Sequence, residues 1–145
     1  MLIGIPKILP PELLKVLMEM GHGDELLLAD GNFPAASHAQ RLIRCDGHNV
    51  PGLLDAILKL FPLDSYAAKP ASLMQVMPGD PVKTPIWEQY RAIIANRTGL
   101  TDSLEEIERS AFYERSRKAY AIVSTGESAL YANLMLRKGV VIDAE

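Results

Sequence analysis

Short apolar runs alternate with longer segments of helical periodicity along most of the chain. The runs at residues 25–29 and 118–125 are short, rich in aliphatic side chains and followed by a turn containing glycine, as buried strands often are. Residues 10–20 and 49–61 place leucine at helical spacing and carry proline in the expected first turn. This alternation predicts a layered α/β fold.

The remaining elements follow from the same patterns. They predict a helix over residues 85–98 that stops at Gly99, and strands at residues 40–45, 72–77 and 131–141. The segment 101–119 is ambiguous, although Ser103 and Glu106 match a capping box and favour a helix from its start. No repeat or linker interrupts the chain, so residues 1–145 are predicted to form a single domain with its own core.

Composition narrows the classes of partner. The net charge of −3 disfavours nucleic acid, because phosphate binding needs an excess of basic side chains. No apolar run approaches the roughly 20 residues that span a bilayer, and the first residues lack the basic region of a signal peptide. The single cysteine, Cys45, cannot form an internal disulfide. We therefore expect a cytoplasmic protein.

His22 lies between Gly21 and Gly23, where the first helix gives way to the first strand. One interpretation is structural, since a cationic side chain can bind the last carbonyls of a helix. The other is acid–base catalysis, because an imidazole with a pKa of about 6.5 gives and takes protons near neutrality. The two glycines would let a ligand approach the ring closely.

Asp30 follows the predicted strand 25–29, and the carboxyl ends of strands line the usual ligand crevice of α/β sheets. The alternative is an ordinary Asp-Gly turn. Tyr131 and Asn133 are two residues apart, so a strand there would place both hydrogen-bonding side chains on one face. Arginines and aromatic residues gather at residues 109–120, a pattern that a solvated helix face also explains.

Several other chemistries find no support. His22, His38 and His48 lack the spacing of a zinc site. Cys45 precedes Asp46, which would raise the pKa of the thiol and disfavour a nucleophile. The nucleophile-elbow and phosphate-loop motifs are missing.

Taken together, five segments resemble the L-fucose mutarotase / D-ribose pyranase family. They lie in order between Pro11 and Val140 and read "PELLKVLMEMGHGDE", "ADGNFPA", "LDSYA", "AFYERSRKAYAIVSTGE" and "YANLMLRKGV". The "AFYER" segment is similar to the fucose branch. One stretch departs from the family pattern, because typical members carry an apolar strand where this chain has "SLEEIER".

The resemblance implies a Rossmann-like three-layer α/β/α sandwich with a mixed, mainly parallel sheet. It implies a monosaccharide substrate, no cofactor, no metal, and a homo-oligomeric ring with sites at subunit contacts. The site residues that it implies are the proton donor His22, the sugar-binding side chains of Asp30, Arg109, Tyr131 and Asn133, and the backbone of Ala132.

The implied reaction interconverts the α and β anomers of a reducing sugar, most simply L-fucose, by opening and reclosing the ring. Such an acid must regain its proton in every cycle, which suits histidine. His22 and Asp30 would then stand at the two ends of one short strand. Three alternatives stay open: a pyranase acting on D-ribose, a non-catalytic sugar-binding accessory of an uptake system, which would not need His22, and a pure assembly protein.

Overall fold

The computed structural model describes residues 1–144 of the chain. Its six strands are β1 (Glu25–Ala29), β2 (Leu42–Cys45), β3 (Ala71–Met74), β4 (Leu104–Ile107), β5 (Ala121–Thr125) and β6 (Leu134–Arg137). Its helices are α1 (Pro11–Glu19), α2 (Ala35–His38), α3 (Val50–Leu58), α4 (Ile86–Thr98) and α5 (Arg109–Lys118).

The strands form one sheet in the order β2-β5-β1-β6-β3-β4. The neighbours β2 and β5, β5 and β1, and β3 and β4 are parallel, whereas β6 is antiparallel to both β1 and β3. Five strands therefore run in one direction and β6 runs against them. The predicted mixed, mainly parallel sheet is confirmed.

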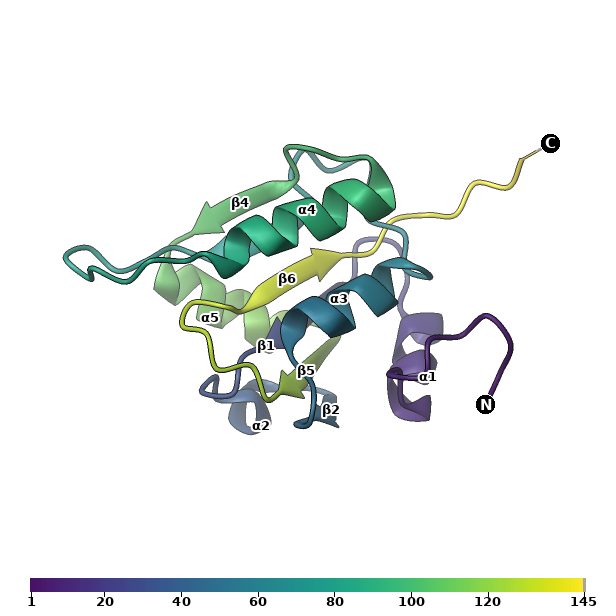
Figure 1. Cartoon of the computed structure of the whole chain (residues 1–145), viewed down its shortest axis with the longest axis horizontal. Helices are drawn as coiled ribbons and strands as arrows, with labels where there is room; N and C mark the ends of the chain where they lie inside the picture. The colour runs from purple at the N-terminus through teal and green to yellow at the C-terminus, as the bar shows by residue number, and fades with distance from the viewer. Residues whose placement is uncertain (145) are drawn as a thin grey trace.

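Helices cover both faces of the sheet, which explains why β1 is apolar at four successive positions. Leu26 and Leu28 belong to the core that α1, α3 and α4 close from one side. Leu27 and Ala29 point the other way and pack with residues of α2 and α5. Figure 1 shows α3 and α4 in front of the sheet and α5 behind it. The predicted three-layer arrangement is confirmed.

Several helix ends follow the sequence signals. The Asn49 side chain accepts a hydrogen bond from the Gly52 N–H at the start of α3. Gly99 ends α4 in the left-handed conformation, at φ 78°. The end of α1 differs, because Met20 already has an extended backbone and the helix stops at Glu19. Gly21, which follows the predicted helix 10–20, therefore does not end it in the left-handed conformation.

The ambiguous segment 101–119 does not form a helix from its start, although the capping-box match favoured one. Residues 104–107 form β4, which pairs in parallel with β3 along its whole length. The helix begins only at Arg109, and Glu108 rather than Ser103 caps it by accepting from two backbone N–H groups. β4 is an edge strand, where charged side chains are tolerated and discourage pairing with another chain.

The strand predicted over residues 131–141 is shorter than expected. β6 starts at Leu134, so Tyr131, Ala132 and Asn133 lie in the loop before it. Tyr131 adopts a positive φ of 55°, which breaks the strand alternation. The side chains of Tyr131 and Asn133 therefore do not share a strand face, and each is held by different hydrogen bonds.

The two termini lie at the same end of the molecule (Figure 1). Large hydrophobic side chains are exposed in the two terminal segments, among them those of Met1, Leu2, Ile3, Val141 and Ile142.

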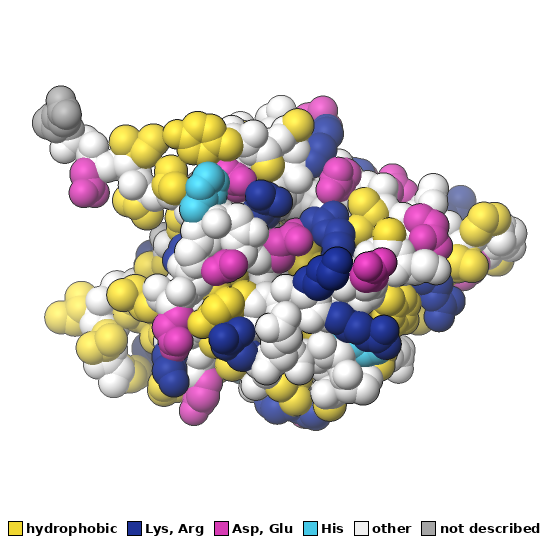
Figure 2. Space-filling model, turned by 180° about the vertical axis from the view of Figure 1, so that it is seen from behind, with side chains coloured by type: hydrophobic (Ala, Val, Ile, Leu, Met, Phe, Trp, Pro, Cys, Tyr) yellow, Lys and Arg dark blue, Asp and Glu magenta, His cyan; other side chains and the backbone are white. Residues whose placement is uncertain are grey.

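Figure 2 shows basic side chains interspersed with acidic ones on the face that carries α5. Among residues 1–144, no helix has the length and apolar character needed to cross a membrane.

Candidate functional site

The predicted site residues divide between two opposite edges of the sheet. We call the edge where the five parallel strands end the carboxyl edge. β6 starts there because it runs the other way, so the loop 131–133 meets the end of β1. We call the opposite edge, where β1 begins and β6 ends, the amino edge.

At the carboxyl edge, Asp30 and Asn133 are joined directly. The Asp30 backbone N–H donates to Asn133 Oδ1 at 2.8 Å, although the two residues are 103 positions apart. The Asp30 carboxylate accepts from the Asn32 N–H at 2.9 Å. The predicted proximity of Asp30 and Asn133 thus follows from the antiparallel pairing of β1 and β6.

Asp30 is a buried carboxyl in an acidic environment. Burial raises the pKa of Asp30 above its ordinary value, and the nearby Glu127 carboxylate raises it further. Backbone N–H groups of residues 32, 132 and 33 oppose this shift without cancelling it. Such a carboxyl can accept hydrogen bonds from the hydroxyl groups of a ligand.

Two aromatic side chains of α4 hold the loop before β6. Trp87 Nε1 donates to the Tyr131 carbonyl at 2.7 Å, and the Tyr90 hydroxyl donates to the Ala132 carbonyl at 2.6 Å. The Tyr131 hydroxyl in turn donates to Asp80 at 2.7 Å. These bonds support a backbone conformation that a bulky residue rarely adopts.

Arg109 begins α5 at the carboxyl edge, above a group of aromatic rings. Its guanidinium carbon lies 5.5 Å from the centre of the Tyr113 ring, and Tyr113 stacks on Phe33 at 5.3 Å. His38 packs against both rings. A hollow of about 740 Å³ opens here, lined by His38, Arg109, Ser110, Tyr113, Glu114 and Arg117. A sugar ring could lie in this hollow against apolar and hydrogen-bonding groups.

His22 lies at the amino edge and its side chain is 46% exposed. Its Nε2 is 3.1 Å from Oδ1 of the buried Asp64, and its ring lies 5.6 Å from the Tyr66 ring. Burial opposes ionisation of Asp64, but hydrogen bonds from the Tyr66 N–H, His22 and Arg137 outweigh it, so the pKa of Asp64 lies below its ordinary value.

The helix-capping interpretation of His22 is not what the structure shows. Lys138 Nζ binds the carbonyls of Leu17 and Met20 at the end of α1. His22 is bonded instead to Asp64. Gly23 has φ 88°, a backbone conformation that L side chains rarely adopt, so the backbone itself favours glycine there.

Within one chain, His22 is separated from the other predicted site residues. β1 has five residues, so at about 3.3 Å per residue it spans roughly 17 Å between the two edges. A single monosaccharide cannot reach from His22 to Asp30 over that distance. The structure therefore joins Asp30 to Asn133, places Tyr131 and the start of α5 at the same carboxyl edge, and leaves His22 at the other edge.

Sequence reasoning missed the residues that support the site. Asp64 and Tyr66 belong to "LDSYA", which contributes to the family resemblance, yet their contact with His22 could not be read from it. Tyr113 lies in "AFYER" and Trp87 lies in the predicted helix 85–98, where no local signal marks either residue as part of a site. Cys45 is buried, and its pKa is raised first by burial and then by Asp46. Among residues 1–144, no group of three or more His, Cys, Asp or Glu residues could hold a metal ion.

Known proteins give this arrangement a context. The chain is 52% identical over 144 residues to the fucose mutarotase of Homo sapiens. The match covers 95% of this chain and 93% of the human protein. The fold superposes with a TM-score of 0.93 on a Streptococcus pneumoniae fucose mutarotase in complex with L-fucose, at 55% identity, covering 97% of this chain and 100% of that one. FucU from Bifidobacterium longum gives a TM-score of 0.94 and also 55% identity, covering 96% and 99%. The family model of the RbsD / FucU transport proteins matches residues 3–141, and the chain belongs to this family.

Proposed function

We propose that the protein is an L-fucose mutarotase, an isomerase that interconverts the α and β anomers of the free sugar. The observation that carries the proposal is the near full-length similarity, at about half identity, to proteins named fucose mutarotase, one of them solved with L-fucose. The side chains at the two edges provide the acid–base and hydrogen-bonding groups that this reaction needs.

In this mechanism, a proton is delivered to the ring oxygen while the anomeric hydroxyl loses one. The C1–O5 bond breaks, C1 becomes an aldehyde, rotation about C1–C2 follows, and the ring recloses on the other face. We assign the proton transfer to His22, whose ring is half-exposed and held from behind by Asp64. Asp30, Asn133 and Tyr131 offer oxygen and nitrogen atoms to the sugar hydroxyls, and Arg109 offers a fork of donors.

The separation of His22 from Asp30 supports a site built by two subunits. In this proposal, the amino edge of one subunit faces the carboxyl edge of its neighbour. Contacts of this head-to-tail kind close into rings when the rotation permits. The exposed hydrophobic side chains of both terminal segments also fit burial against another copy. A cytoplasmic location fits the one cysteine, which is buried as a free thiol.

A non-catalytic sugar-binding accessory is the second candidate, and the word "transport" in the family's name is what favours it. Such a protein needs the binding groups of the carboxyl edge but gains nothing from His22 and its carboxylate partner. Loss of anomer exchange with unchanged fucose binding in His22→Ala would therefore exclude it.

The test is saturation-transfer NMR on the anomeric protons of L-fucose, with D-ribose measured in parallel. We expect wild-type protein to accelerate exchange of L-fucose more than that of D-ribose. His22→Ala should lower the exchange rate by roughly 10²–10⁴-fold, the usual share of a general acid. His48→Ala, which replaces another exposed histidine, is the matched control. Exchange in His22→Ala equal to that of the control would refute the assignment.

A further inference from the structure

We propose that Asp64 is a positioning residue for His22, which it holds with Nε2–H directed inward and Nδ1 directed to the sugar. The inference rests on the proposed function, because it concerns the same histidine. It assigns the proton transfer to one atom, Nδ1, and it assigns the orientation of the ring to a side chain 42 positions away.

The Asp64 carboxylate is fixed by three donors. Oδ1 accepts from the Tyr66 backbone N–H at 3.0 Å and lies 3.1 Å from His22 Nε2. Oδ2 accepts from Arg137 Nε at 3.0 Å. The Asp64 side chain is only 2% exposed, so water cannot readily replace these partners. A carboxylate held in this way offers the imidazole one fixed acceptor.

The protonation state of the carboxylate decides which ring nitrogen is free. Hydrogen bonds keep the pKa of Asp64 below its ordinary value, so the group is ionised near neutral pH and can only accept. His22 Nε2 must then carry its hydrogen in both the neutral and the protonated ring. Nδ1 is left as the atom that gains and loses a proton, and the ring is half-exposed so that a ligand can reach it.

The backbone around Asp64 is clamped to β6. Leu63 forms an antiparallel bridge with Lys138, and the Asp64 N–H donates to the Arg137 carbonyl at 3.1 Å. Gly139 permits this close approach, because a Cβ there would lie 2.6 Å from the Leu63 carbonyl oxygen. Asp64 is therefore tied to the same strand that supplies its arginine partner.

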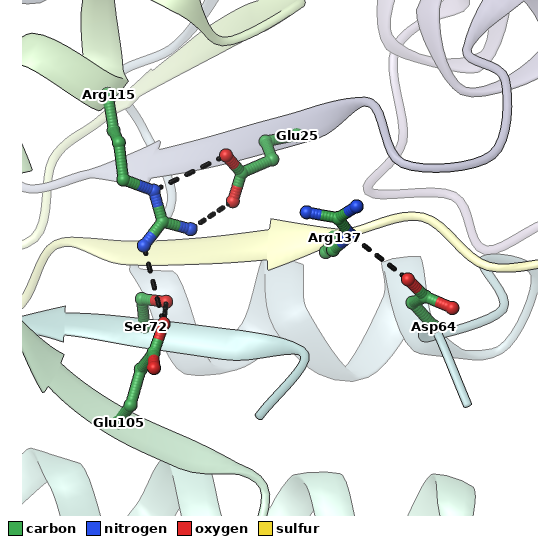
Figure 3. Close-up of polar contacts among 6 residues, drawn as sticks. All are labelled: Glu25, Asp64, Ser72, Glu105, Arg115 and Arg137. Carbon is green, nitrogen blue, oxygen red and sulfur yellow. Dashed lines mark hydrogen bonds and ion pairs between the residues drawn. The ribbon is translucent and has the colours of Figure 1, made fainter. Parts of the chain in front are cut away.

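A row of alternating charges continues from Asp64 across the sheet, as Figure 3 shows. Arg137 is the register partner of Glu25 on β1. Glu25 binds Arg115 of α5, which also binds Glu105 of β4 at 3.3 Å. Each carboxylate in the row lies beside a guanidinium, and Arg137 is the one that binds Asp64 directly, at 3.0 Å. The row orients groups and does not itself transfer protons.

The first test needs no substitution. The ¹⁵N shifts of the imidazole nitrogens are recorded for wild-type protein at a pH high enough to keep the rings neutral. We expect His22 to be almost wholly the Nε2–H tautomer, whereas the exposed His48 should show a mixture. A His22 ring that carries its hydrogen on Nδ1, or that shows the same mixture as His48, would overturn the proposal.

The second test compares Asp64→Asn with Asp55→Asn. Both replace an aspartate that is paired with an arginine, but Asp55 binds Arg97 on the outer surface of α3 and α4. We expect Asp64→Asn to lower kcat for L-fucose by roughly 10-fold or more, because an amide in place of the carboxylate no longer fixes the Nε2–H tautomer of His22. KM should stay within about twofold of wild type, because Asp64 does not touch the sugar.

The outcomes separate this inference from the proposed function. If His22→Ala abolishes exchange but Asp64→Asn retains wild-type kcat, the positioning role is wrong and the mutarotase assignment stands. If His22→Ala retains full exchange, the assignment of His22 fails first. A rise in KM with unchanged kcat in Asp64→Asn would show a role in binding and would also overturn the inference.

Discussion

Replacing Tyr90 with phenylalanine removes one hydroxyl from the support of the loop before β6. Tyr90 is fully buried, and its hydroxyl donates to the Ala132 carbonyl at 2.6 Å. Ala132 is also fully buried, so no water replaces the lost donor. The substitution therefore leaves one carbonyl unpaired between two residues that we propose bind sugar.

The expected cost is about 1–3 kcal/mol, which is the usual penalty for leaving a buried polar group without its partner. For a chain of this size, each kcal/mol lowers the melting temperature by roughly 2–4 °C, so the shift should be roughly 2–12 °C. The phenyl ring itself stays in place, so no cavity forms. KM for L-fucose should rise, because Tyr131 and Asn133 flank the carbonyl that loses its bond.

Calorimetry at one fixed protein concentration measures the shift, since subunit association makes melting temperatures depend on concentration. Tyr120→Phe is the matched control, because the Tyr120 hydroxyl binds Glu19 at the surface at 3.3 Å. The control should change the melting temperature little. Equal melting temperatures for the two variants would refute the idea that Tyr90 supports the loop.

Four further predictions follow from the structure. Gly126→Ala should abolish stable folding, because its Cβ would lie 2.1 Å from the Asp46 carbonyl oxygen, and circular dichroism of the expressed protein checks this. Asp30→Asn should unfold at a urea concentration at least as high as wild type at pH 7 while binding L-fucose more weakly. Because the pKa of Asp30 is raised, its ionisation at neutral pH destabilises the folded protein, and protonation removes this cost. The stability gap between the two proteins should therefore shrink as the pH falls. Asp64 has the opposite effect on the free energy of unfolding. Its pKa is lowered from 3.8, so the ionised carboxylate stabilises the folded protein above pH 3.8, and this contribution is lost at lower pH. Urea titrations of wild type and Asp64→Asn should therefore converge in acid. Arg109 is exposed and presents a fork of donors that can bridge two neighbouring hydroxyls. Arg109→Ala should therefore reduce the preference for L-fucose over D-ribose in kcat/KM; an unchanged ratio in the NMR exchange assay would show that Arg109 does not select the sugar.

The sequence was informative wherever one local signal decided the structure. Asn49 and Gly99 mark helix ends that need only neighbouring backbone groups. The apolar residues of β1 indicate a strand covered on both faces. β4 was missed because its local capping signal favoured a helix, while pairing with β3, about 30 residues away in the chain, stabilises a strand there.

The candidate site shows the same limit. Asp30 could be proposed from its place after a strand, because that position follows from the fold class. Asp64 could not, since its importance depends on contacts with His22 and Arg137, which are 42 and 73 positions away. The positive φ of Tyr131 also depends on distant partners in α4. Such features become visible only when the chain is folded.

Mixed assemblies give the most direct test of the central claim, that an L-fucose mutarotase site is shared by two subunits. His22→Ala and Asp30→Asn carry different affinity tags, are co-expressed, and are purified through both tags before L-fucose exchange is measured by NMR. Each variant alone should show little exchange. If one subunit supplies His22 and its neighbour supplies Asp30, about a quarter of the sites in a mixed assembly are intact and should regain wild-type activity. A mixed assembly no more active than the mean of its two parents would contradict the shared site.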